Sequence, residues 1–152
     1  MTAINIAGKL GLVSEHWSPK IVASFNGHDV MVVKVKGEFV WHSHADTDDF
    51  FYVVKGNLTL RLRDRDVLLG PGDLYIVPKG VEHCPVAAEE VHLLLIEPAG
   101  TPNTGDPATA AVTSGPSRTA RPGSRAGRPA MVPQAGPASV LPAGGDGLAC
   151  SR

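Results

Sequence analysis

Residues 37–56 decide the fold of this chain, and they read GEFVWHSHADTDDFFYVVKG. Within them, His42 and His44 stand two residues apart in a β-rich segment, where a period of two sends both imidazole rings to the same face. The short ADTD stretch then turns the chain, and Asp49 begins the next β-rich segment. Because the loop resets the phase, we expect the Asp49 carboxylate to face the same interior as the two histidines.

A second strand–turn–strand unit occupies residues 72–85, GDLYIVPKGVEHCP. Its turn, at residues 78–80, returns the chain and brings His83 toward the first unit. Three imidazoles and one carboxylate form a mixed nitrogen and oxygen ligand set, which suits Fe(II), Mn(II), Ni(II), Cu(II) or Zn(II) and suits Mg²⁺ or Ca²⁺ poorly. We therefore predict one divalent transition metal as the cofactor. The predicted ligands are His42, His44, Asp49 and His83.

The two units together resemble the two motifs of the cupin superfamily. The first motif is represented by Gly37, His42, His44, Asp49 and Gly56, with one residue fewer than usual before the first histidine. The second is represented by Gly72, Pro78, Gly80 and His83, with Ala87 where the family has asparagine. The resemblance covers residues 20–98 and implies an all-β fold, the jelly-roll or double-stranded β-helix barrel.

A narrower resemblance concerns the stretches WHSHADTDDFFYVVKGNLTLRLRD (41–64) and LIEPAGT (95–101). They are similar to small bacterial cupins called mannose-6-phosphate isomerase-like. This resemblance implies a single small domain that acts on a small polar substrate. The name indicates homology only, because those proteins are much shorter than true phosphomannose isomerases.

The carboxylate ligand departs from the family pattern, because Asp49 stands where the family has glutamate. The side chain is one methylene shorter, and metal–oxygen distances are only ~2.0–2.2 Å. Asp49 would therefore bind after a small strand shift or through a water molecule, or it would leave the role to Asp48 or to a site of three histidines. We take Asp49 as the expected ligand.

Residues 20–98 alternate β-rich segments with Gly, Pro and Asn turn signals, as in an all-β sandwich or barrel. The expected strands are 20–25, 29–36, 39–44, 49–54, 58–64, 66–70, 74–78, 83–87 and 90–98. No stretch has a convincing helical period, and the first dozen residues are expected to form a turn or a short added strand.

The segment DFFYVV (49–54) is apolar on both faces. Phe51 and Val53 share one face, and the alternate residues share the other. A strand that is apolar on both sides is covered on both sides. The cover is either a second layer of this chain or another subunit, and we expect a homodimer.

The composition changes at residue 104. Residues 104–152 consist mostly of Ala, Gly, Pro, Ser, Arg and Thr, which bury too little apolar surface to offset chain entropy. We therefore predict a cupin domain at 1–103 and a disordered, low-complexity tail at 104–152.

Charge, cysteine content and hydropathy exclude several classes of protein. Residues 1–103 carry nine Lys and Arg against thirteen Asp and Glu, which disfavours a nucleic-acid partner. Cys84 and Cys150 form no disulfide framework, which favours a cytoplasmic location. We expect no signal peptide, and the longest apolar run, 93–96, is far below the roughly 20 residues of a membrane span.

Apart from the predicted metal ligands, the sequence offers few residues that could take part in a reaction. Side chains expected in the barrel wall are Phe39, Phe51, Leu60, Leu62 and Ile76. Weak candidates for acid–base chemistry are Asp48, Tyr52, Tyr75 and Glu82, and none is assigned as catalytic. An isomerase needs such a group, so dioxygenase chemistry is favoured over isomerase-like chemistry. The alternative is a non-catalytic cupin that binds a metal or a small ligand as a dimeric module.

Overall fold

The computed structural model describes residues 2–106 and 117–118. Contacts along the chain separate residues 1–121 from residues 122–152, and every described residue lies in the first unit. Of the predicted tail the structure describes only 104–106 and 117–118, so the prediction of disorder lies mainly outside the described residues and remains a prediction.

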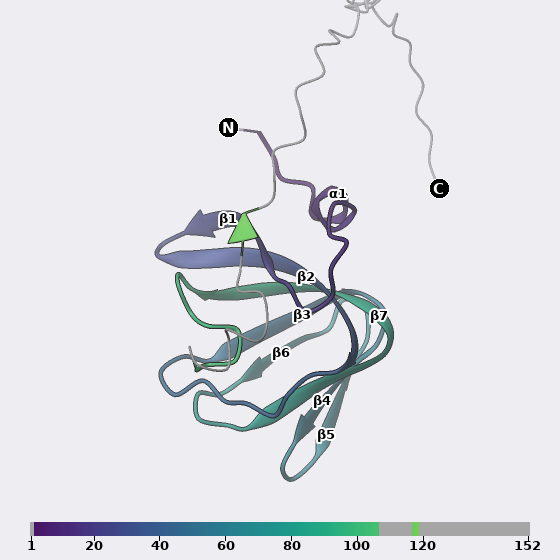
Figure 1. Cartoon of the computed structure of the whole chain (residues 1–152), viewed down its shortest axis with the longest axis vertical. Coiled ribbons are helices and arrows are strands. Elements are labelled where there is room, and N and C mark those ends of the chain that lie inside the picture. Colours follow the sequence, from purple (N-terminus) through teal and green to yellow (C-terminus); the bar gives the residue numbers. More distant parts are fainter. Residues whose placement is uncertain (1, 107–116, 119–152) are drawn as a thin grey trace, which may run out of the picture. The chain divides into compact units, whose positions relative to one another are not determined.

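The described residues form one short helix and a single β-sheet, shown in Figure 1. The elements are α1 (Ile6–Leu10), β1 (Lys20–Phe25), β2 (His28–Glu38), β3 (Asp49–Lys55), β4 (Leu58–Leu62), β5 (Asp66–Leu69), β6 (Leu74–Val77), β7 (His83–Pro98) and β8 (Ser117–Arg118). This arrangement confirms the expected all-β class.

Strand β7 organises the sheet because it pairs with three others. Its first residues pair with β4, residues 92–96 pair with β3, and β2 runs antiparallel to it along the opposite edge. β6 pairs with β3, β5 pairs with β4, and β1 lies between β2 and the two-residue β8. Side chains from β2 through β7 form one buried cluster, so the sheet curls around a common core.

The N-terminal segment forms a helix, so the expectation of a turn or an added strand was wrong. The Gly8 backbone N–H donates to Asn5 Oδ1 at 2.7 Å and caps α1 at its first turn. Leu10 then packs with Val13 against Val32 on the outer face of the sheet. A helix of five residues is too short to display a helical period in the sequence.

Two of the expected strand boundaries also change. Residues 39–44 form no continuous strand and contribute one isolated bridge, between His42 and His83. The expected strands at 83–87 and 90–98 are one strand of 16 residues, and β2 pairs with it on both sides of a register shift between Val35 and Gly37.

The inward faces of the strands follow the expected alternation, except in β6. Phe51 and Val53 are buried as predicted, but Ile76 is 47% exposed and lines no core, which corrects its assignment to the barrel wall. The β3–β6 register pairs Phe51 with Tyr75 and so turns Tyr75 and Val77 inward.

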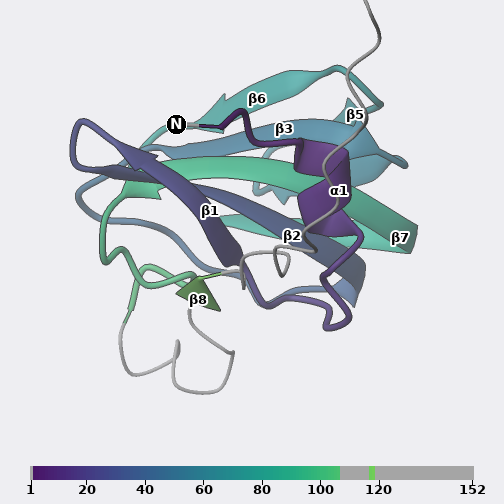
Figure 2. The same cartoon turned by 90° about the horizontal axis from the view of Figure 1, so that it is seen from above.

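The outer face of β3 is covered at one end by the helix. Val54 and Leu94 pack beneath Leu10 and Val13, and Figure 2 shows α1 over the side of the sheet where β2 and β7 run. Phe50 and the rest of the strand are only half-buried on this face. No helix in the described part of the chain is long and apolar enough to cross a membrane.

Candidate metal centre

The four predicted ligands come together in the structure. Asp49 opens β3 and His83 opens β7, whereas His42 and His44 lie on the segment that connects β2 to β3. One ligand atom from each residue lies within 4.8 Å of the others. Ligands that each lie about 2.0–2.3 Å from one ion are separated by no more than about 4.6 Å. The cluster is therefore close to the size of a mononuclear metal site.

Backbone pairing joins the two histidine motifs. The His42 N–H donates to the His83 carbonyl at 3.0 Å, and the His83 N–H donates back to the His42 carbonyl at 2.9 Å. Each ring also places Nδ1 near the carbonyl two residues before it, Val40 for His42 at 2.9 Å and Val81 for His83 at 3.0 Å. A proton on Nδ1 leaves the Nε2 lone pair directed into the cluster, as metal-binding histidines require.

Several atoms of the cluster fit a metal better than they fit one another. Both ring nitrogens of His44 and Oδ1 of Asp49 are buried without a hydrogen-bond partner among the described residues. His83 Nε2 lies 3.1 Å from Asp49 Oδ2, and both are acceptors when His83 donates its Nδ1–H to Val81. Buried polar atoms are almost always partnered, and a cation in this space would satisfy one ring nitrogen of His44 together with the Asp49 carboxylate and His83 Nε2.

Burial sets the protonation states of these groups. Burial, and next the neighbouring His83, lower the pKa of His42 to about 4, and burial likewise lowers the pKa of His44. Burial acts to raise the pKa of Asp49, but the close approach of His83, and next that of His44, outweigh it and hold that pKa below its ordinary value. Neutral imidazoles and an ionised carboxylate are the states that metal binding requires.

The structure distinguishes the two candidate aspartates. Asp48 is exposed, and its Oδ1 accepts a hydrogen bond from the Lys79 N–H at 2.9 Å. This bond ties the loop before β3 to the turn at 78–80. Asp49 faces the histidines and is 4% exposed. The carboxylate of the cluster is therefore Asp49.

The sequence analysis missed Glu97, a second buried carboxyl group beside the cluster. Glu97 is 4% exposed, and one residue beyond the Phe50–Ile96 pair the β3–β7 register places it opposite Asp49. Burial first, and the negative charge of Asp49 second, raise the pKa of Glu97 to about 9. The period of two through Leu93 and Leu95 predicts an inward Glu97 and could have identified it.

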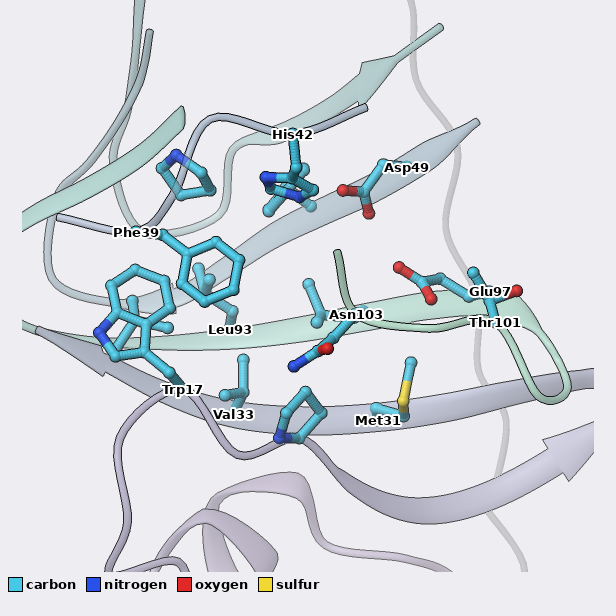
Figure 3. A pocket seen from close by; sticks show the side chains of 15 residues that line it. Trp17, Met31, Val33, Phe39, His42, Asp49, Leu93, Glu97, Thr101 and Asn103 are labelled. Carbon is cyan, nitrogen blue, oxygen red and sulfur yellow. The ribbon is translucent and has the colours of Figure 1, made fainter. Parts of the chain in front are cut away.

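A cavity of about 50 Å³ lies against the cluster. Most of its walls are apolar. The lining residues include Trp17, Met31, Val33, Phe39, Phe51 and Leu93. Its polar side chains are His42, Asp49, Glu97, Thr101 and Asn103. Figure 3 shows Trp17 and Phe39 at one end, Glu97 and Thr101 at the other, and His42 and Asp49 along one side.

The other acid–base candidates lie outside this cavity. Tyr52 points to the outer face of β3, and Tyr75 contacts Arg65, whose guanidinium lies 3.3 Å from its hydroxyl. Glu82 forms an exposed ion pair of 2.8 Å with Arg63. None of these residues lines the cavity.

Comparison with known proteins agrees with the fold. The family model described as a Cupin domain matches residues 29–97. A crystal structure of a cupin-2 domain containing protein from Shewanella frigidimarina NCIMB 400 is 48% identical, with a TM-score of 0.62, over 62% of this chain and 93% of that chain.

Two curated relatives are more distant. The uncharacterized protein YdbB of Bacillus subtilis is 33% identical over 41% of this chain and 56% of its own length. A 3-hydroxyanthranilate 3,4-dioxygenase of Brucella anthropi is 33% identical over 49% of this chain and 46% of its own length. The chain thus spans about half the length of these relatives.

Proposed function

The chain belongs to the cupin family, and from this premise we propose that it is a metal-dependent dioxygenase acting on a small molecule. Its ligands would be His42, His44, Asp49 and His83. The observation that carries the proposal is the cluster of three imidazoles and one carboxylate, in which both ring nitrogens of His44 and Oδ1 of Asp49 are buried without a hydrogen-bond partner among the described residues. A transition metal bound there would supply Lewis-acid activation of a substrate oxygen and, if it is iron, redox chemistry with O₂.

The chain's own residues supply the setting for this chemistry. His42 and Asp49 both line the cavity, so a substrate in the cavity would meet the cluster directly. The apolar walls would exclude bulk water from the reacting groups. The backbone pairing of His42 with His83 would hold the two motifs in register while substrate exchanges.

Dioxygenase chemistry is favoured over sugar-phosphate isomerisation by the charge of the cavity. No Lys or Arg is found among the described residues that line it, so a phosphate group would have no side-chain partner of opposite charge. Glu97 does supply one acid–base group that an isomerase would need. The 33% identity to a dioxygenase over 46% of that protein's length supports oxygen chemistry.

Reconstitution with Fe(II) under anaerobic conditions tests the proposal. We expect the reconstituted protein to hold one iron per chain. After transfer to aerated buffer, it should consume oxygen when compounds from a panel of small hydroxylated molecules, including 3-hydroxyanthranilate, are added. His83→Ala should lose both iron and oxygen uptake. Stoichiometric metal without oxygen uptake for any compound would instead favour the non-catalytic cupin. A protein that binds no metal would exclude the dioxygenase and the four ligand assignments.

We also propose a homodimer, formed through the outer face of β3 and β6. Phe50 pairs with Ile76, and Tyr52 pairs with Leu74, on neighbouring strands. Ile76 is 47% and Leu74 is 49% exposed in the single chain. These four residues, named here the outer patch, would be buried against a second copy.

A further inference from the structure

No cationic side chain lines the cavity beside the metal cluster among the described residues, although three lysines lie on neighbouring strands. Lys20, Lys34 and Lys36 lie on β1 and β2 near it, but each points outward toward a glutamate. The Nζ to carboxylate distances are 3.3 Å for Lys20–Glu15, 3.9 Å for Lys34–Glu90 and 3.3 Å for Lys36–Glu89. An anionic group on a ligand in this cavity would lose its hydration without gaining a side-chain cation.

One end of the cavity is acidic. The β2–β7 register pairs Asp29 with Glu97, and Asp49 lies opposite Glu97 on the other side. All three side chains are buried, with exposed fractions of 8% for Asp29 and 4% for Glu97 and Asp49. Of the three, Asp49 and Glu97 line the cavity, where carboxyl oxygens accept hydrogen bonds from hydroxyl or amino groups. Asp29 lies beyond them, and its Oδ1 accepts a hydrogen bond from Ser24 Oγ at 2.6 Å.

The opposite end of the cavity is an aromatic wall fixed by the backbone. Trp17 has a φ of 58°, which is unusual for a residue other than glycine. Its backbone N–H donates to the Lys34 carbonyl at 2.9 Å, and its indole Nε1–H donates to the Lys36 carbonyl at 2.8 Å. Its ring stacks on Phe39 with centroids 4.8 Å apart. Flat rings pack well against such a pair.

We propose that the ligand of this cavity is an uncharged aromatic compound of a single ring that carries hydroxyl or amino groups. The ring lies against the apolar walls near Trp17 and Phe39, and its polar substituents face Asp49 and Glu97. The cavity volume of about 50 Å³ suits a compact ligand, since it holds roughly three to five water molecules. This inference rests on the proposed function, because it names the substrate class of the same site.

Matched pairs of ligands that differ by one carboxylate test the inference. The pairs are 2-aminophenol with 3-hydroxyanthranilate, and catechol with 2,3-dihydroxybenzoate. Zn(II)-loaded protein is used so that binding is measured without turnover, by calorimetry and by Trp17 fluorescence. The chain has two tryptophans, and Trp41→Phe leaves Trp17 as the single reporter at the cavity.

We expect the uncharged member of each pair to bind at least ten times more tightly than its carboxylated partner. Equal or tighter binding of the carboxylated member would overturn the inference, and so would failure of both uncharged compounds to bind at millimolar concentration. The proposed function is contradicted by different results, namely the absence of bound metal or the absence of oxygen uptake. Ligand binding to metal-free protein still measures the preference of the cavity in that case.

Two variants separate the contribution of charge from that of the ring. Asn103→Lys places a cation at the half-buried edge of the cavity. It should lower the ratio of the two dissociation constants in each pair, carboxylated over uncharged, at least tenfold. Asn103→Gln is the control and should leave this ratio unchanged. Trp17→Leu should weaken both members of a pair equally. If Asn103→Lys leaves the ratio of the dissociation constants unchanged, the absence of a cation does not cause the preference for uncharged ligands.

Discussion

At the scale of single residues, Asp49 stands where the family has glutamate, and it remains a candidate ligand because its carboxylate lies against His44 and His83. Asp49 starts β3 beside the β6 turn, and its carboxylate meets His83 Nε2 at 3.1 Å and His44 Nε2 at 3.5 Å. Its shorter side chain is compatible with the cluster because all four ligand atoms already lie within 4.8 Å of one another.

Asp49→Asn should lower metal affinity by more than ~10–100-fold, the loss that removing an outer hydrogen-bond partner of a metal ligand typically causes. Asp48→Asn is the matched control, since it alters only the exposed bond to the Lys79 N–H. Metal affinity by competition with a chromophoric chelator decides between them. A larger loss of metal affinity in Asp48→Asn than in Asp49→Asn would show that Asp49 is not the carboxylate ligand.

Glu97 should make the stability of the metal-free protein depend on pH above neutrality. Its pKa is raised to about 9 in the fold from an ordinary 4.5, so between these values the folded state holds a proton that the unfolded chain has lost. The contribution of this proton to stability is therefore fully present below pH 4.5 and is lost as the pH rises toward 9. We expect the free energy of unfolding to fall by ~1–3 kcal/mol from pH 7 to pH 9.

Urea unfolding at the two pH values measures this effect. Glu97→Gln keeps the shape of the side chain and removes its titration, so its stability should change much less over the same range. His42 and His44 do not interfere, because their pKa values are lowered and both rings are neutral above pH 7. Equal pH dependence in the two proteins would refute the effect.

At the scale of elements, the segment after β7 closes over the first histidine motif. Gly105 has a φ of 70°, and a Cβ added to it would overlap the carbonyl of Ser43, next to His44. Only a glycine permits this approach of the two backbones. Residues 99–106 therefore help to position His44.

Gly105→Ala should lower metal affinity as well as stability, because the displaced segment would shift His44. Gly100→Ala is the control: its φ of 86° gives similar backbone strain, but nothing lies within 4 Å of the added Cβ. Each variant should lose ~1 kcal/mol from backbone strain, measured by thermal unfolding. Metal affinity should fall only in Gly105→Ala, and equal losses in the two would remove this role of the segment.

At the scale of the whole molecule, the outer patch predicts the oligomeric state. Ile76→Glu should convert a dimer to a monomer in sedimentation equilibrium, because it would bury an unpaired charge in the interface. Leu68→Glu is the control, since Leu68 is 76% exposed on β5 and lies outside the patch. A wild-type monomer, or dissociation by Leu68→Glu as well, would contradict the proposed interface.

The sequence predicted what depends on local spacing and missed what depends on register. His42, His44 and His83 could be grouped because strand period and turns act over a few residues. Asp49 was already preferred to Asp48 from the sequence, and the contact of Asp48 with the Lys79 N–H shows how the structure holds Asp48 outside the cluster. Ile76 was assigned to the wrong face because the turn before β6 sets its phase, and Glu97 gains its importance only from lying opposite Asp49.

Strand β7 has a consequence for how such a protein diversifies. It carries His83 at its first residue and Glu97 near its last, within one continuous strand of 16 residues. The group that would hold the metal and the group that faces the ligand are thus separated along one rigid element. Substitutions at Leu93 and Leu95, which line the cavity and are not among the four predicted ligands, would change ligand preference and leave the ligand residues in place. Descendants of one ancestral chain could in this way acquire new substrates without losing their metal.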